Sequence, residues 1–185
     1  PEDTKERILR FNERLDDVVT RSKKAFSREE TYGQGFAVYD MSYAAGVSAS
    51  TIAIGIEVSI APDGLLKISN AIASVDCGLA VNPDIVESQI AGGMIFGISN
   101  ALYGEITLKN GRVEQSNFHD YPLLKLKDSP KIKVYIADSS DKTPNGIGEG
   151  AVPVAIAALV DAIANAGGPR IRKLPILDGS GRISV

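Results

Sequence analysis

An alternation of residue types near the middle of the chain most constrains the fold. Between Thr51 and Ile60, every second residue is a large β-branched apolar residue: Ile52, Ile54, Ile56, Val58 and Ile60. A period of two places these side chains on one face of a β-strand, and that face packs on a core. The turn sequence Ala61-Pro-Asp-Gly64 and the apolar segment Leu65 to Val75 follow directly. The sequence therefore predicts an antiparallel hairpin.

The N-terminal segment has the spacing of an amphipathic helix. From Glu2 to about Ser27, apolar residues recur at helical intervals between charged ones: Ile8, Phe11, Leu15 and Val18. A stripe of this kind is typical of a surface helix that packs one side on a core. We therefore predict a helix that covers the domain from outside.

A second helix is predicted from Pro83 to about Tyr103. Asn82 is a good N-cap, and proline suits the first position of a helix because that position needs no N–H donor. Small residues follow at intervals of four, namely Gly93, Gly97 and Ala101. Residues four apart share one face of a helix, so another backbone can pack closely there.

Shorter elements complete the predicted fold. Alternating residues indicate strands at Gly35–Met41 and Lys131–Asp138, and Ile171–Ile176 is a candidate last strand. Asn110-Gly111 suits a type I′ hairpin turn. An alanine-rich helix is predicted after Pro153. We expect an α+β fold with antiparallel strands packed on two core helices, in which residues 1–31 form an additional N-terminal helix and residues 32–185 the domain itself.

Composition and charge exclude several classes of function. The net charge is −3 and the basic residues are dispersed, so we expect no nucleic-acid partner. A single cysteine, Cys77, leaves no internal disulfide and no cysteine-only metal site, and we expect no metal ligands in this chain. We expect no membrane span either, because no apolar segment is long enough. The sequence lacks an initiator methionine, so we expect a fragment of a longer polypeptide.

A glycine-rich turn before the alanine-rich helix is the candidate functional site. It reads Thr143-Pro-Asn-Gly-Ile-Gly-Glu149-Gly-Ala-Val-Pro153, and glycine permits positive φ angles and close approach of another group. Glu149 is expected to be partly desolvated and able to act as a general base. The residues alone leave three functions open: a base, a phosphate cradle on backbone N–H groups, or a plain turn.

Three segments together resemble the C-terminal part of the large subunit of molybdenum hydroxylases, the xanthine dehydrogenase and aldehyde oxidase superfamily. They are Val75-Asp-Cys-Gly-Leu-Ala-Val-Asn-Pro-Asp84, Gln89-Ile-Ala-Gly-Gly-Met-Ile-Phe-Gly97 and Gly146-Ile-Gly-Glu149. The segments Ala101-Leu-Tyr-Gly-Glu-Ile-Thr-Leu-Lys109 and Gln115-Ser-Asn-Phe-His-Asp-Tyr-Pro122 resemble the β subunit of isoquinoline 1-oxidoreductase in particular. Residues 32–185 would then be the C-terminal piece of a molybdopterin-binding domain.

The resemblance implies hydroxylation of a carbon atom in a nitrogen heterocycle or an aldehyde, with water as the oxygen source. It implies a molybdenum-bearing molybdopterin cofactor in its cytosine dinucleotide form, and [2Fe–2S] clusters in a small partner subunit. Glu149 would be the general base, and Gln89, Gly92, Gly146 and Gly148 would contact the cofactor. The remainder of the large subunit would complete the site, so we expect the fragment alone to be inactive.

Other interpretations remain open beside this one. The chain could be a non-catalytic packing or assembly module of the same family, or a phosphate-binding domain that uses the turn from Gly146 to Ala151. Phe96 stands where the xanthine dehydrogenase branch has a glutamine, which counts against purine oxidation.

Overall fold

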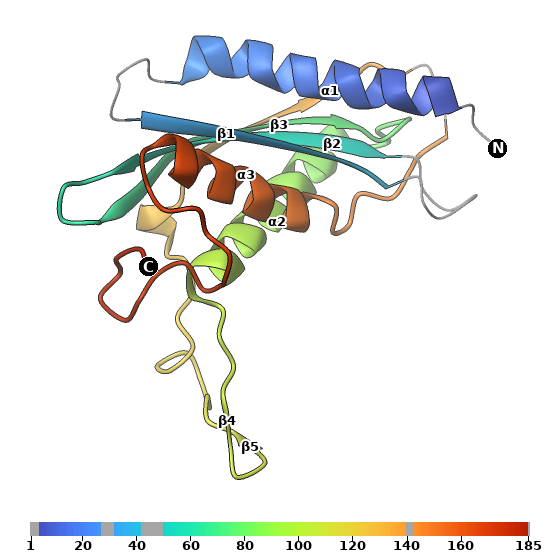
Figure 1. Ribbon diagram of the computed structural model, residues 1–185. Helices are drawn as coiled ribbons and strands as arrows, with labels where there is room; N and C mark the ends of the chain where they lie inside the picture. The colour runs from blue at the N-terminus through green and yellow to red at the C-terminus, as the bar shows by residue number, and fades with distance from the viewer. Residues whose placement is uncertain (1–3, 27–31, 42–49, 140–142, 185) are drawn as a thin grey trace.

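A computed structural model describes residues 4–26, 32–41, 50–139 and 143–184. A four-stranded sheet lies between two layers of helix (Figure 1). Helix α1 (Thr4–Ala25) covers one face of the sheet, and helices α2 (Pro83–Tyr103) and α3 (Ala151–Asn165) cover the other. The predicted α+β class, with two core helices and an additional N-terminal helix, is confirmed. The predicted helix ends Glu2 and Ser27 lie outside the described residues.

The sheet has the order β1-β2-β3-β6. Its strands are β1 (Tyr32–Asp40), β2 (Thr51–Ile60), β3 (Leu66–Asp76) and β6 (Lys131–Ile136). The first three pair antiparallel, as predicted, but β6 lies parallel to β3, with Asn70 opposite Lys131. The reason is the connection between them, because a chain that returns through a helix can enter the sheet in the direction of the earlier strand.

Strand β2 is buried on both faces because helices cover both sides of the sheet. Ile52, Ile54 and Ile56 are fully buried in the main core with α2 and α3. Ala53 belongs to a second core beneath α1, together with Val18 and Phe26. The predicted apolar stripe of α1 packs only in part, since Val18 is fully buried whereas Ile8 is exposed.

A polar network also attaches α1 to the sheet. Asp17 accepts a hydrogen bond from the Ser74 hydroxyl at 2.7 Å and one from Arg21 Nε at 2.8 Å. The Arg21 guanidinium in turn lies 3.8 Å from the centre of the Tyr135 ring. Burial alone would raise the pKa of Asp17, but the bonds from Ser74 and Arg21 outweigh it and lower the pKa. Helix α1 is therefore a packed layer of this structure, and the division at residue 31 stays a proposal.

Helix α2 begins and packs as the sequence predicts. The Asn82 side-chain oxygen accepts a hydrogen bond from the Ile85 N–H at 3.2 Å, and Pro83 is the first helical residue. Gly93 lies against Ala151, and a Cβ at Gly97 would collide with the carbonyl oxygen of Val152. The small residues of α2 thus allow α3 to approach its backbone closely.

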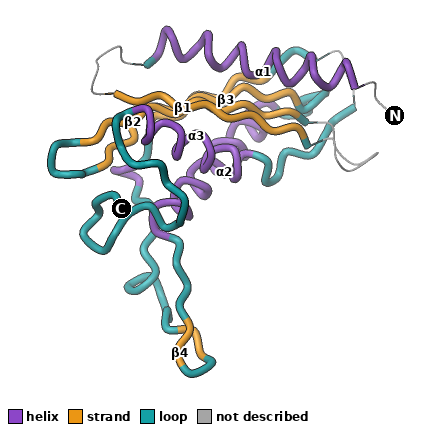
Figure 2. Tube along the Cα trace, in the orientation of Figure 1, coloured by secondary structure: helices purple, strands orange, loops and turns teal. Residues whose placement is uncertain are grey.

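Residues 105–123, here called the arm, leave the helical layer after α2 and project away from the sheet (Figures 1 and 2). The arm carries the short strands β4 (Leu108–Lys109) and β5 (Arg112–Val113). Asn110 and Gly111, between these strands, have φ angles of 51° and 76°, and positive values at both positions are what the predicted type I′ turn requires. The chain returns to the domain where the Leu124 N–H donates to the Ser99 hydroxyl, and the 3-10 helix η1 (Leu126–Asp128) follows.

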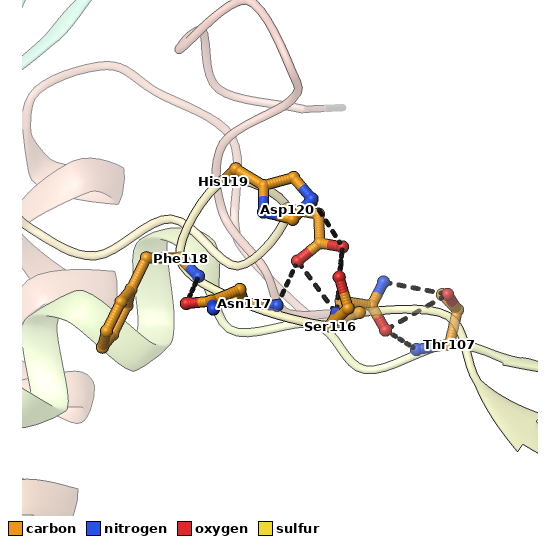
Figure 3. Close-up of polar contacts among 7 residues, drawn as sticks. Thr107, Ser116, Asn117, Phe118, His119 and Asp120 are labelled. Atoms are coloured by element: carbon orange, nitrogen blue, oxygen red, sulfur yellow. Dashed lines mark hydrogen bonds and ion pairs between the residues drawn. The ribbon is translucent and has the colours of Figure 1, made fainter.

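Two polar clusters hold the arm in shape (Figure 3). The Gln115 side chain accepts from the Thr107 N–H at 2.8 Å and donates to the Thr107 hydroxyl at 3.0 Å. The Asp120 carboxylate accepts from the N–H groups of Asn117 and Ser116 and from the Ser116 hydroxyl, all within 3.0 Å. These bonds close the predicted irregular segment into a defined turn.

Titration of Asp120 should reveal this turn directly. The N–H of Asn117, followed by the groups of Ser116, lowers the pKa of Asp120 to about 2. A depressed folded pKa means that the carboxylate supports the turn above the pKa of the unfolded chain, about 4, and that this support disappears as the pH falls toward 2. Carboxyl carbon shifts followed by NMR should give this midpoint, and a midpoint near 4 would show that the bonds are absent in solution.

The candidate strand at Ile171–Ile176 is wrong. The Ile176 and Leu177 N–H groups donate to the carbonyl oxygens of Ala101 and Leu102 in the last turn of α2, at 2.8 and 3.1 Å. The segment therefore satisfies helix carbonyls and does not extend the sheet. No helix in the described part of the chain is long and apolar enough to span a bilayer.

Candidate active site

A cavity of about 580 Å³ lies where α2, the start of α3 and the end of β1 meet. Four of the five predicted site residues line it: Gln89, Gly92, Gly148 and Glu149. Phe96, Met41 and Tyr39 add apolar and aromatic surface. The structure thus brings together two segments that are far apart in the sequence, around residues 89–96 and 148–153.

Glu149 is the last residue of the loop before Gly150, the N-cap of α3. Its carbonyl oxygen accepts the Val152 N–H at 3.1 Å, which starts the helix. The side chain lines the cavity but is exposed, which corrects the expectation of partial desolvation. The reason is positional: Glu149 precedes the apolar helix, and the buried residues of α3 pack on the sheet and on α2.

Gln89 connects the two sides of the cavity. Its Nε2 donates to the carbonyl oxygen of Gly148 at 2.6 Å, which joins the second turn of α2 to the residue before Glu149. A hydrogen bond at this distance fixes the loop relative to the helix. In this chain Gln89 therefore positions the peptide that carries Glu149.

Gly146 anchors the loop and does not line the cavity. Its carbonyl oxygen accepts a hydrogen bond from the buried Ser50 hydroxyl at 2.8 Å. The neighbouring Asn145 N–H donates to the Cys77 carbonyl oxygen at 2.9 Å, and the Leu79 N–H donates to the Thr143 carbonyl oxygen at 3.2 Å. The loop is therefore fastened to the ends of β2 and β3 before it reaches Glu149.

The glycines around the cavity fall into two groups. A Cβ at Gly97 would collide with the backbone carbonyl of Val152, so packing requires glycine there, whereas one at Gly150 would meet only the side-chain ends of Met41 and Ile52. Among the residues that the structure describes, no atom lies within 4 Å of a Cβ built at Gly92 or Gly148. Within the described residues, positive φ angles at glycine are confined to Gly64, Gly78, Gly111, Gly167 and Gly181, so the loop glycines do not use the left-handed backbone that glycine permits. The glycines at 92 and 148 instead leave space open in the cavity.

Tyr39 and Met41 line the cavity although no sequence motif points to them. Tyr39 lies near the end of β1 and Met41 follows that strand, more than forty residues before Gln89, and an ordinary strand end gives no signal of a site. In the sequence, Phe96 was singled out only because it replaces a glutamine of the xanthine dehydrogenase branch. In the structure, its exposed ring lies beside Gly92 and Gly93 on the cavity wall. That all three residues line the cavity is visible only in the folded structure.

Protein ligands for a metal do not converge in the described part of the chain. No group of three or more His, Cys, Asp or Glu side chains there could hold a metal ion. Cys77 is buried, and its pKa is raised first by that burial and second by the charge of Asp76. A thiol of this kind is a packing residue and a poor metal ligand.

The sequence match decides the family. Residues 5–130 match the family described as a molybdopterin cofactor-binding domain. The chain belongs to this family. The matched range of the molybdopterin cofactor-binding domain includes most of α1, the first three strands of the sheet, α2 and the arm. Gln89 and Gly92 lie inside it, and Glu149 lies beyond its end.

Curated relatives of this molybdopterin cofactor-binding domain are named as subunits of oxidoreductases. The β subunit of isoquinoline 1-oxidoreductase from Brevundimonas diminuta is 34% identical over 114 residues, or 62% of this chain and 14% of that protein. A nicotinate dehydrogenase subunit from Pseudomonas putida is 31% identical over 147 residues, or 78% of this chain and 12% of that protein. The chain therefore spans about one-seventh of the length of these relatives, and the resemblance to the isoquinoline 1-oxidoreductase β subunit is confirmed.

Solved structures include the same fold. Quinoline 2-oxidoreductase from Pseudomonas putida 86 superposes with a TM-score of 0.58 at 29% sequence identity. The superposition covers 63% of this chain and 16% of that one. Like the sequence relatives, this structure contains the domain as a small part of a longer polypeptide.

Proposed function

We propose that this chain is part of a molybdopterin-dependent oxidoreductase subunit that hydroxylates a carbon of an N-heterocycle or an aldehyde, with water as the oxygen source. Glu149 is the general base. Gln89, Gly92 and Gly148 contact the cofactor, which is the cytosine dinucleotide form, and Gly146 anchors the loop beside it. The remainder of the large subunit completes the site, and a small subunit with [2Fe–2S] clusters accepts the electrons.

The open cavity wall is the observation that supports this proposal. A Cβ at Gly92 or Gly148 would meet no atom of the described residues within 4 Å, whereas their neighbours Gly93 and Gly150 are packed against side chains. A cavity beside a carboxylate, with backbone left bare on two sides, fits a ligand that approaches closely. The residues present therefore suit the molybdopterin group for which the family is named.

The chain's own residues have three roles in the proposed reaction. The bound cofactor supplies the redox chemistry of the hydroxylation. The Glu149 carboxylate accepts a proton from the water-derived group as it becomes the attacking oxygen, which a carboxylate at the mouth of a cavity can do. Gln89 holds the Gly148 carbonyl and thereby the direction in which Glu149 projects. Phe96 and Tyr39 give the same cavity aromatic surface.

Elemental analysis of the full-length polypeptide, purified with its partner subunit, tests the enzyme hypothesis. We expect stoichiometric molybdenum and reduction of an electron acceptor with isoquinoline, nicotinate or an aliphatic aldehyde as substrate. Protein that folds and assembles but contains no molybdenum would favour the non-catalytic assembly module. Binding of inorganic phosphate to the same protein, lost in Gly148→Val, would favour the phosphate-binding domain.

Gly92→Ala and Gly97→Ala should have opposite effects on stability. Alanine at the exposed position 92 removes the cost of a helical glycine and should stabilise the domain by about 1 kcal/mol. Alanine at position 97 meets the Val152 carbonyl and should destabilise it by about 1–3 kcal/mol. Denaturant unfolding measures both. If the cofactor occupies the cavity, Gly92→Ala should also lower the molybdenum content of the full-length protein despite its higher stability.

A further inference from the structure

Asp76 is a buried carboxylate at the end of the sheet where the loop of the candidate site is fastened. It is the last residue of β3 and is 6% exposed, and it does not line the cavity. In the sheet it lies opposite Thr51, the residue after Ser50, whose hydroxyl holds Gly146. A charged group is rarely buried unless hydrogen bonds satisfy it, so the bonds of Asp76 indicate what it does.

The Asp76 carboxylate closes a turn that follows β3. Its Oδ1 accepts a hydrogen bond from the Gly78 N–H at 3.0 Å. Gly78 has a φ angle of 66°, which lies in the left-handed region that favours glycine. An aspartate that accepts from the N–H two residues ahead stabilises a turn of this kind. Asp76 therefore fixes the direction in which the chain leaves the sheet.

The turn at Gly78 holds the start of the glycine-rich loop. On one side of Gly78, the Cys77 carbonyl oxygen accepts the Asn145 N–H at 2.9 Å. On the other side, the Leu79 N–H donates to the Thr143 carbonyl oxygen at 3.2 Å. A Cβ at Gly78 would collide with that same carbonyl oxygen, so the two backbones are in direct contact. A change in the turn must therefore move the loop.

We infer that Asp76 is a positioning residue for Glu149. Its carboxylate orders the turn at Gly78, the turn holds the loop, and the loop presents Glu149 at the cavity. Asp76 acts at the start of the loop, whereas Gln89 holds its end through the Gly148 carbonyl. This inference rests on the proposed function, because the position of Glu149 matters to turnover only if its carboxylate is the base. A base must lie within hydrogen-bond reach of the proton that it accepts, so a small displacement lowers kcat.

Three substitutions of Asp76 in the full-length polypeptide test the inference. Asp76→Asn keeps an oxygen that can accept the Gly78 N–H, Asp76→Glu keeps the charge but carries it one methylene further, and Asp76→Ala removes both. We expect a kcat near the wild-type value for Asp76→Asn and about tenfold lower for the other two, with KM and molybdenum content little changed. If Asp76→Ala does not fold, the comparison of Asp76→Asn with Asp76→Glu still decides.

Hydrogen exchange followed by mass spectrometry measures the loop in the same variants without reference to turnover. The Leu79 and Asn145 N–H groups should exchange faster in Asp76→Glu and Asp76→Ala than in Asp76→Asn or the wild type. Asp63→Ala is the matched control. Asp63 also accepts an N–H two residues ahead, from Leu65 at 3.2 Å, but in the turn at the opposite end of β2 and β3. Its substitution should leave kcat and the exchange of the loop unchanged.

Several outcomes would overturn the inference. A normal kcat in Asp76→Glu, even at a lower melting temperature, would leave Asp76 with a role in stability alone. A loss of turnover in Asp76→Asn as large as in Asp76→Glu would show that the hydrogen bond does not carry the effect. If the wild-type protein itself does not turn over substrate, the proposed function fails, and the exchange rates show separately whether Asp76 holds the loop.

Discussion

Glu149→Gln in the full-length polypeptide is expected to lower kcat of the proposed hydroxylation by about 10²–10⁴-fold, the usual contribution of a general base. Glutamine has the same size but cannot accept the proton. The loop before it should not move, because Gly146 and Gly148 are held through their carbonyl oxygens by Ser50 and Gln89. Molybdenum content and thermal stability should therefore stay at the wild-type level while turnover is lost.

Glu87→Gln provides the matched control for this experiment. Glu87 is an exposed glutamate on α2 that lies two residues before Gln89 and does not line the cavity. Its substitution removes the same charge from nearby and should leave kcat unchanged. If Glu149→Gln loses molybdenum together with turnover, Glu149 holds the cofactor instead of acting as a base. If it turns over substrate normally, Glu149 has no part in the reaction.

Gly35→Ala is expected to destabilise the domain by about 3 kcal/mol or more, the upper range for overpacking. Gly35 lies in β1 opposite Ile56, and a Cβ there would collide with the backbone of Ala158 and Ala162 in α3. Helix α3 cannot easily move away from β1, because two hydrogen bonds hold it there. Its Asp161 carboxylate accepts from the Phe36 N–H at 3.2 Å, and its Asn165 side chain donates to the Gln34 carbonyl at 2.8 Å.

Denaturant and thermal unfolding measure this effect, and roughly 2–4 °C of melting temperature is expected for each kcal/mol in a domain of this size. Gly179→Ala is the control, because a Cβ at that position meets no atom of the described residues within 4 Å. If Gly35→Ala unfolds at the wild-type temperature, α3 does not lie on β1 as closely as described.

Local signals predicted the parts of the fold that depend on few neighbours. The alternation from Thr51 to Ile60 gives the limits of β2, because a period of two is a property of the strand itself. Asn82 and Pro83 predict the start of α2, since an N-cap bond spans only three residues. Asn110 and Gly111 predict their turn for the same reason.

Features set by tertiary contacts could not be predicted in this way. The parallel direction of β6 depends on the path of the connection through α2, and Ile176 bonds to the end of that helix instead of forming a strand. For the candidate site, the glycine-rich turn itself pointed to Gly148 and Glu149, whereas Gln89 and Gly92 were selected through their resemblance to a family. Tyr39 and Met41 were missed because only folding brings them to the cavity. The catalytic role of Glu149 stays a prediction until its variants are measured.

The two kinds of glycine along the cavity wall have a consequence for protein engineering. On α2, Gly93 and Gly97 hold the helices together, while Gly92 and Phe96, each one residue earlier, face open space. Positions that tolerate change therefore alternate with positions that do not along a single helix. Libraries that vary residues 92 and 96 together should yield mostly folded proteins, so the shape of the cavity can be redesigned independently of the stability of the domain.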